Sequence, residues 1–209
     1  MMTRVETMEQ PSNSKKDELS ICLNRLEKDP QNPEKYISVA RAYERLKEYK
    51  KAEEYIKRAL ELDPDNIAIY RGIEALAYRQ RDYYKAIEAV TKAIEMAPEE
   101  AYFYCSRGKS YEMLKKYQNA IDDYSKSIKL DPNNTVYMMQ RANSYREISN
   151  WRKALKDLKT IVKIEPSNEI AKIRIRYIER EHLHDGRQNI DNKKSKDSGL
   201  KIKGINLRM

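Results

Sequence analysis

Few side chains in this sequence have the types and spacing that catalysis or metal binding requires. The two histidines, His182 and His184, lie two positions apart near the end of a predicted helix, so they face different sides and are not expected to share a metal ion. The adjacent Asp122 and Asp123 suggest an acid–base pair, but one solvated carboxylate and one ion-pair partner account for them. Five glycines in 209 residues are too few for a phosphate-binding loop. The sequence therefore predicts a protein that is not an enzyme and holds no cofactor.

The cysteine content and the apolar runs bear on the cellular compartment. Cys22 and Cys105 lack the spacing of a disulfide framework or of a metal site. The sequence contains no run of about 18 apolar residues and no N-terminal apolar stretch of signal-peptide length. We therefore expect a cytoplasmic protein without a transmembrane segment.

The composition favours thin helical layers over one thick core. Charged residues make up 36% of the chain, and it contains a single Phe and a single Trp. Apart from a few C-terminal residues, no stretch alternates between apolar and polar side chains as a half-buried strand does. The sequence therefore predicts an all-α fold.

A proline recurs every 34 residues, and the pattern around it repeats without insertion or deletion. Each interval contains two amphipathic helical patterns separated by a short polar break. Proline has no backbone N–H and disfavours helix in the residue before it, so each proline is expected to end the second helix of a unit. The recurring prolines are Pro30, Pro64, Pro98, Pro132 and Pro166.

This pattern resembles the tetratricopeptide repeat, whose signature is W-x2-L-G-x2-Y, A-x3-F and P over 34 residues. The alanine slot, where the two helices of a repeat approach closely, is filled by Ala52, Ala86, Ala120 and Ala154. The resemblance implies an all-α fold, a right-handed superhelical solenoid of helix-turn-helix tetratricopeptide repeats. The predicted repeats are 33–66, 67–100, 101–134 and 135–168.

A repeat cannot cover its own apolar face, so the ends of the array must be closed. Residues 17–32 match only the second helix of a unit and are predicted to form a half-repeat capping helix after a disordered segment 1–16. Residues 169–185 are predicted to form the C-terminal capping helix. The basic tail 186–209 is expected to be disordered, with a docking motif or an anionic-membrane contact as alternatives.

Two repeats carry arginine where the signature has leucine. A buried unpaired charge is costly, so Arg107 and Arg141 each need an acidic partner. Asp123 and Asp157 occur only in these two repeats, immediately before the Phe slot. The sequence predicts the structural ion pairs Arg107–Asp123 and Arg141–Asp157 within each repeat, the alternative being that all four groups are solvated.

The second repeat departs from the signature at its small-residue slot. Glu74 stands where the other repeats have Ala40, Gly108 and Ala142. We expect a looser or more polar helix junction there.

The resemblance to tetratricopeptide repeat proteins implies that the first helix of each repeat lines a concave groove. Apolar, aromatic and basic side chains interleave on the corresponding stripe, which a purely solvated face is not expected to show. The alternative is that some of these tyrosines and methionines fill the inter-helix core. The candidate ligand-groove residues are Arg71, Tyr78, Arg79, Tyr102, Cys105, Lys109, Met113, Met139, Asn143 and Arg146.

These features predict a non-catalytic scaffold for protein–protein interaction. The partner is expected to be a protein or peptide segment that is acidic with apolar anchors. The chain has a net charge of +9, and the excess of basic residues is concentrated toward the C-terminus. Binding of RNA or DNA by the basic C-terminal half is therefore an alternative. Self-association of a second copy in the groove or on the capping helix is another.

Overall fold

A computed structural model describes residues 11–183, and side chains from residue 14 to 182. Within this range the chain forms ten α-helices and one π-helical turn, and no strand occurs there, so the all-α prediction is confirmed. None of the described helices is long and apolar enough to span a membrane. Predictions for residues 1–10, His184 and the tail 186–209 fall outside the described residues.

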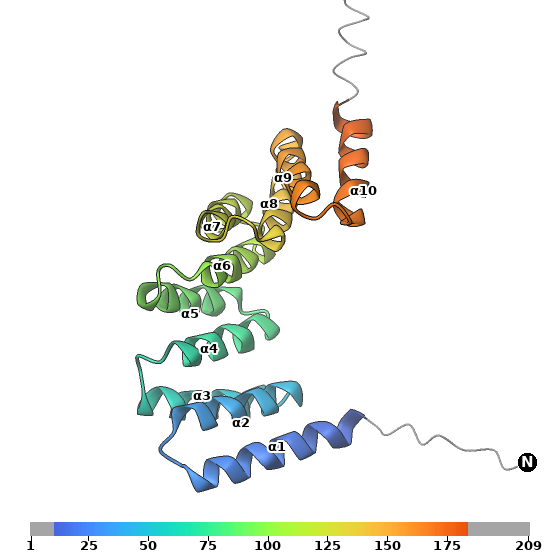
Figure 1. Ribbon diagram of the computed structural model, residues 1–209. Coiled ribbons are helices and arrows are strands. Elements are labelled where there is room, and N and C mark those ends of the chain that lie inside the picture. The colour runs from blue at the N-terminus through green and yellow to red at the C-terminus, as the bar shows by residue number, and fades with distance from the viewer. Residues whose placement is uncertain (1–10, 184–209) are drawn as a thin grey trace, which may run out of the picture. The chain divides into compact units, whose positions relative to one another are not determined.

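The contacts divide the chain into two compact units, residues 1–130 and 131–209. In the first unit, three helix pairs follow a single N-terminal helix in chain order (Figure 1). Its helices are α1 (Pro11–Lys28), α2 (Pro33–Arg45), α3 (Tyr49–Leu62), α4 (Ile67–Arg79), α5 (Tyr83–Met96), α6 (Ala101–Met113) and α7 (Tyr117–Leu130).

The second unit contains one helix pair, α8 (Thr135–Glu147) and α9 (Trp151–Ile164), followed by α10 (Glu169–Ile178), which packs against α9. The π-helical turn η1 (Glu179–Leu183) continues α10. His182 of this turn stacks on Trp151, with ring centroids 3.6 Å apart. Trp151 is the single Trp of the chain, so its fluorescence reports on this end of the second unit.

The four turns inside the repeats share one backbone geometry. One residue of each turn has positive φ and is not glycine, at 56–64° in the left-handed region. The next backbone N–H then donates to a carbonyl of the first helix, for example Lys116 to Tyr111 at 2.9 Å, which is a Schellman-type helix end. The four residues are Lys47, Arg81, Lys115 and Ser149.

The segments around the recurring prolines end one helix and begin the next. The second helix of each repeat ends two residues before its proline, as the missing donor of proline requires. After every recurring proline except Pro98, where Glu100 makes no side-chain cap, an asparagine two residues on caps the following helix; Asn66 Oδ1 accepts from the Ala68 N–H, and Asn66 Nδ2 donates to Asp63. The same capping asparagine occurs at Asn32, Asn134 and Asn168.

The core of the first unit is built from small and branched side chains between paired helices. Ala52, Ala86 and Ala120 are all but fully buried, which allows close helix approach. The apolar face of α1 packs against the core formed by α2, α3 and α4. This helix begins at Pro11, earlier than the predicted residue 17, because proline is tolerated in the first turn and the apolar pattern marks only the packed part of the helix. The packed residues of α1 are Leu19, Cys22, Leu23 and Leu26.

Candidate functional site

The structure joins Arg107 and Asp123 across α6 and α7 by two parallel hydrogen bonds. Arg107 Nε donates to Asp123 Oδ2 and Arg107 Nη2 donates to Asp123 Oδ1, each at 2.8 Å. Both side chains are largely buried, at 20% and 9% exposed, so the pair is shielded from water. Hydrogen bonding by Asp123 raises the pKa of Arg107. This ion pair therefore connects α6 and α7, the two helices of the third repeat.

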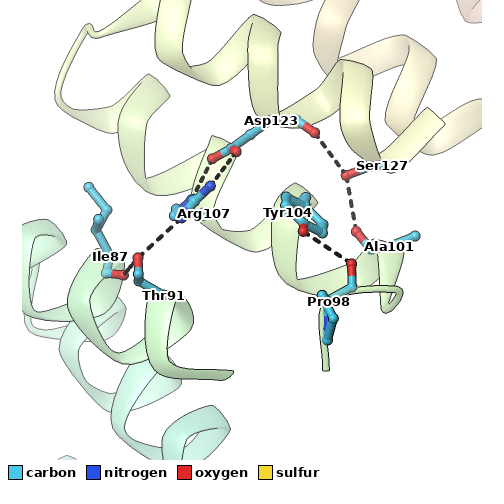
Figure 2. Close-up of polar contacts among 8 residues, drawn as sticks. All are labelled: Ile87, Thr91, Pro98, Ala101, Tyr104, Arg107, Asp123 and Ser127. Carbon is cyan, nitrogen blue, oxygen red and sulfur yellow. Dashed lines mark hydrogen bonds and ion pairs between the residues drawn. The ribbon is translucent and has the colours of Figure 1, made fainter. Parts of the chain in front are cut away.

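Arg107 also reaches the preceding repeat. Figure 2 shows its guanidinium between Asp123 on α7 and Thr91 on α5. Arg107 Nη1 donates to Thr91 Oγ1 at 3.2 Å, while the Thr91 hydroxyl donates to the Ile87 carbonyl at 2.8 Å. Sequence reasoning missed Thr91, because a helical threonine commonly bonds its own backbone and gives no sign of a distant partner.

In the second unit, Arg141 and Asp157 make the same bidentate contact between α8 and α9. Both hydrogen bonds measure 2.8 Å, and the side chains are 21% and 7% exposed. In both repeats, the arginine in the leucine slot therefore pairs with the aspartate immediately before the Phe slot, with the same geometry.

Most of the remaining candidate residues lie on the first helices of the repeats. In the first unit, polar contacts connect α1, α2, α4 and α6 in sequence. Arg45 of α2 pairs with Glu18 of α1, and Arg79 of α4 pairs with Glu44 of α2. The Arg71 guanidinium lies over the Tyr102 ring, 5.3 Å from its centroid, which links α4 to α6. These helices therefore present one continuous face.

We call the solvent-accessible part of this face the first-helix surface; it consists of the exposed Arg71, Arg79, Tyr102 and Met113 and the half-buried Tyr78 and Lys109. Tyr102 and Met113 are 41% and 49% exposed, which is high for large apolar groups in a folded protein. Tyr78 is half-buried and meets Tyr83 edge-on, with centroids 5.4 Å apart. Apolar contact groups and basic groups therefore alternate on this surface.

Cys105 does not belong to the first-helix surface, and its prediction as a groove residue is wrong. The side chain is only 3% exposed, and burial raises the pKa of its thiol to about 11. A short cysteine side chain is covered by its neighbours, whereas Tyr102 and Met113 on the same helix extend beyond them. Cys105 is therefore a core residue with an unreactive thiol.

The basic residues of the first-helix surface are not equally available to a ligand. Arg79 is engaged by Glu44, whose side chain is only 10% exposed. Arg71 and Lys109 form no ion pair within residues 14–182. These two side chains are therefore the cations that an acidic ligand can reach without breaking an existing pair.

Glu74 of α4 is buried next to this surface and faces α6. The Ser106 hydroxyl donates to Glu74 Oε1 at 2.7 Å, so the second repeat has the polar junction that its sequence suggests. Burial raises the pKa of Glu74, and the Ser106 hydrogen bond, Lys109 and Arg71 only partly oppose this. Because Arg71 and Lys109 flank a carboxyl group with a weakened tendency to ionise, their positive charge is incompletely balanced.

Glu74→Gln is expected to stabilise the protein at pH 7, because the amide keeps an acceptor for Ser106 and removes a buried charge. The folded-state pKa of Glu74 is raised, so wild-type protein becomes more stable as the pH falls from that pKa toward the ordinary value of 4.5. The stability advantage of the variant should therefore shrink over this pH range. Chemical unfolding between pH 4 and pH 8 measures this difference. A variant less stable than wild type at pH 7 would contradict the assigned cause.

The candidate residues of the second unit lie on α8 and meet α10. Arg174 Nη1 donates to Asn143 Oδ1 and lies 3.1 Å from Met139 Sδ. Arg146 projects from α8 and pairs with Glu147 through a 2.9 Å contact. Arg174 was expected only to be part of a capping helix; no signal in the sequence separates a capping residue from one that completes a site.

Residues 11–183 contain no group of three or more His, Cys, Asp or Glu side chains placed to hold a metal ion.

Comparison with known proteins identifies the repeat. Residues 33–66 and 101–134 match family models described as tetratricopeptide repeat, and these ranges are the first and third of the predicted units. No curated protein matches the chain at a significant level.

Several solved structures share the fold. A MamA fragment from Desulfovibrio magneticus RS-1 is 18% identical with a TM-score of 0.63, and the match covers 78% of this chain and 99% of the fragment. YrrB, described as a TPR protein with an unusual peptide-binding site, is 19% identical with a TM-score of 0.62, over 77% of this chain and 85% of YrrB. The Arabidopsis OM64 TPR domain is 25% identical with a TM-score of 0.51, over 56% of this chain and 95% of that domain.

These matches agree with the gap-free period, the helix pairs and the turn geometry that recurs in all four repeats of the structure. The predicted helical repeat solenoid is therefore confirmed as a fold class. Residues 33–66 and 101–134 are therefore tetratricopeptide repeats, in a chain with the fold of a tetratricopeptide repeat protein.

Proposed function

We propose that the first-helix surface of the first unit binds a peptide segment of a partner protein that carries acidic residues between apolar anchors. Tetratricopeptide repeat proteins are scaffolds for protein–protein interaction and are generally not catalysts. The observation that carries the proposal is the exposure of Tyr102 and Met113 next to Arg71 and Lys109, the two cations of this surface that form no ion pair with residues 14–182.

Each part of this surface has a separate role in binding. Burial of aromatic and Met side chains supplies most of the affinity in protein interfaces, so Tyr102 and Met113 are the anchors. Charge complementarity raises the association rate and fixes the register of the ligand. Arg71 is already oriented by the Tyr102 ring, which reduces the conformational entropy that it loses on binding a carboxylate.

The test uses peptides selected from a random library for binding to the full chain. Charge reversal at Arg71 and Lys109 is expected to weaken binding of these peptides at least about tenfold, because two attractive contacts become repulsive. Neither residue forms an ion pair in the described range, but both lie near the buried Glu74, so binding is measured well below the melting temperature of the variant. Arg79 is unsuitable for this test, because its reversal would also break the pair with Glu44.

Charge reversal at Lys57 and Lys129 is the matched control, since both are exposed and lie on second helices of the first unit. It makes the same change in net charge away from the first-helix surface. Equal losses of affinity in both double variants would show diffuse electrostatic attraction, as nucleic acid produces, and would contradict the proposal.

A further inference from the structure

The second repeat lacks the large aromatic side chain that the other three repeats have at the last position of W-x2-L-G-x2-Y. This tyrosine slot holds Tyr43, Tyr111 and Tyr145 in the first, third and fourth repeats, but Ala77 in the second. Ala77 is 1% exposed, so its position remains inside the fold. An alanine there leaves the volume of a phenol ring unfilled unless neighbouring side chains take it up.

A pocket of about 310 Å³ lies beside Ala77. Its lining side chains come from α3, α4 and α5, all in the first unit. Leu76 takes up part of the space, since the other repeats have Ala42, Ser110 and Ser144 at its position, but it does not close the pocket. The apolar residues that line the pocket are Ile56, Leu60, Ile73, Leu76 and Ala77.

Ile73 contributes to the same gap. It stands at the position of Arg107, whose guanidinium in the third repeat reaches the second helices on both sides, α5 and α7 (Figure 2). Ile73 is shorter, has no polar group and makes no such bridge between α3 and α5. Both Ile73 and Leu60 are only partly buried. A ligand in the pocket would therefore cover apolar surface that water now reaches, which favours binding.

Two of the tyrosines that fill this slot have a lysine over the ring. Lys51 Nζ lies 5.2 Å from the centroid of the Tyr43 ring, and Lys153 Nζ lies 5.4 Å from the centroid of the Tyr145 ring. Each lysine follows its tyrosine by eight residues and lies in the first turn of the second helix of the repeat. The cation is attracted by the negative face of the π-system, so lysine and ring form one recurring contact.

Lys85 is the corresponding lysine of the second repeat. It follows Ala77 by eight residues and lines the pocket, but no tyrosine occupies the slot beneath it. Its Nζ pairs instead with Glu53 of α3 at 3.0 Å. Both side chains are exposed, so this pair contributes little to stability. The second repeat therefore keeps the cation of the recurring contact and lacks its aromatic half.

We propose that this pocket binds a single aromatic ring of about the size of phenol, which takes the place of the missing tyrosine side chain. An apolar cavity of roughly 150 Å³ already accepts benzene, so the volume is sufficient. The ring would contact Ile56, Leu60 and Ile73 and turn one face toward Lys85. The pocket shares no residue with the first-helix surface, so this site does not depend on the proposed peptide binding.

The probe is p-cresol, which is the tyrosine side chain without its backbone, and its affinity for the full chain is measured by NMR titration. Ala77→Tyr supplies the ring of the other repeats and is expected to weaken binding at least about tenfold, because the new ring fills the pocket. Lys85→Met removes the charge and keeps a long apolar side chain, so it should weaken binding about two- to fivefold. Lys92→Met is the matched control, because Lys92 is exposed on the same helix, pairs with Glu95 and does not line the pocket.

Two further ligands separate the aromatic contact from plain burial and identify the source of the ring. 4-Methylcyclohexanol has nearly the size of p-cresol but no π-face, so it should bind more weakly, and Lys85→Met should not change its affinity. N-acetyl-tyrosinamide carries the same ring on a peptide backbone. Its binding would assign the pocket to a tyrosine side chain of a partner protein, whereas its exclusion with p-cresol still bound would assign the pocket to a free small molecule; both results support the ring site.

Melting temperature tests whether the slot can hold a ring. Ala77→Tyr should melt at the temperature of wild type or above it, and p-cresol should raise the melting temperature of wild type but not of this variant. A lower melting temperature of Ala77→Tyr would show that a ring does not fit and would overturn the proposal. The proposal would also be overturned by the absence of saturable p-cresol binding to wild type, by equal losses in Lys85→Met and Lys92→Met, or by tighter binding of 4-methylcyclohexanol than of p-cresol.

Discussion

Replacing Asp123 with alanine is expected to lower the free energy of unfolding by about 3 kcal/mol, because it leaves a largely buried arginine without its carboxylate. The variant loses both 2.8 Å hydrogen bonds to Arg107, and the remaining bond from Arg107 to Thr91 cannot neutralise the charge. Urea unfolding followed by far-UV circular dichroism measures the loss.

The chain supplies the matched control for this variant. The second repeat has Ile73 and Ala89 at the positions of Arg107 and Asp123. The double variant Arg107→Ile with Asp123→Ala should therefore recover most of the lost stability, since it removes the buried charge together with its partner. A loss below about 1 kcal/mol for Asp123→Ala, or a double variant no more stable than the single one, would show that the pair contributes little.

Replacing Gly108 with alanine is expected to lower the free energy of unfolding by about 2 kcal/mol, because the added methyl overpacks the core. A Cβ at this position would lie 2.8 Å from Cε1 and 3.0 Å from Cδ1 of Tyr124. Tyr124 is fully buried and its hydroxyl donates to Glu112 Oε2 at 2.9 Å, so the ring has little freedom to move. Thermal and urea unfolding of the variant measure the effect.

Gly72→Ala is the matched control for this prediction. There a Cβ would meet Ile37 and Ile56 at 3.8 Å, which is ordinary contact. This helical substitution should raise the stability by roughly 0.5–1 kcal/mol, because alanine restricts the unfolded chain more than glycine. Tyr124→Leu together with Gly108→Ala reproduces the Ala142 and Leu158 of the fourth repeat, and should be more stable than the sum of the single effects predicts. Strict additivity would contradict the proposed clash.

The repeat architecture could be predicted from the sequence because its signals are local and occur several times. Each recurring proline stops a helix within two residues of its own position, so the period fixes the helix ends directly. The Arg107–Asp123 pair could also be predicted from the sequence, because the two departures from the signature occur together and in two repeats. The backbone conformation of the turns could not be predicted, because the residues with positive φ are not the glycines that usually mark it. These residues are Lys47, Arg81, Lys115 and Ser149.

The functional surface was less predictable, because helical spacing specifies a face but not which side chains on it remain free. Cys105 has the spacing of an exposed residue and is nevertheless buried by its neighbours. Arg79 belongs to the exposed stripe but is engaged by Glu44 of the preceding repeat. Arg174 joins Asn143 only because α10 packs beside the fourth repeat, and this contact spans residues far apart in the sequence.

Selection of peptides from a random library on the full chain tests the central claim most directly, because it makes no assumption about the partner. The account predicts that the recovered peptides share Asp or Glu residues spaced between large apolar residues, and that they compete with one another for the first-helix surface. The apolar residues would contact Tyr102 and Met113, and the acidic residues Arg71 and Lys109. Recovery of peptides without acidic residues, or of peptides whose affinity does not change when Arg71 and Lys109 are reversed, would contradict it.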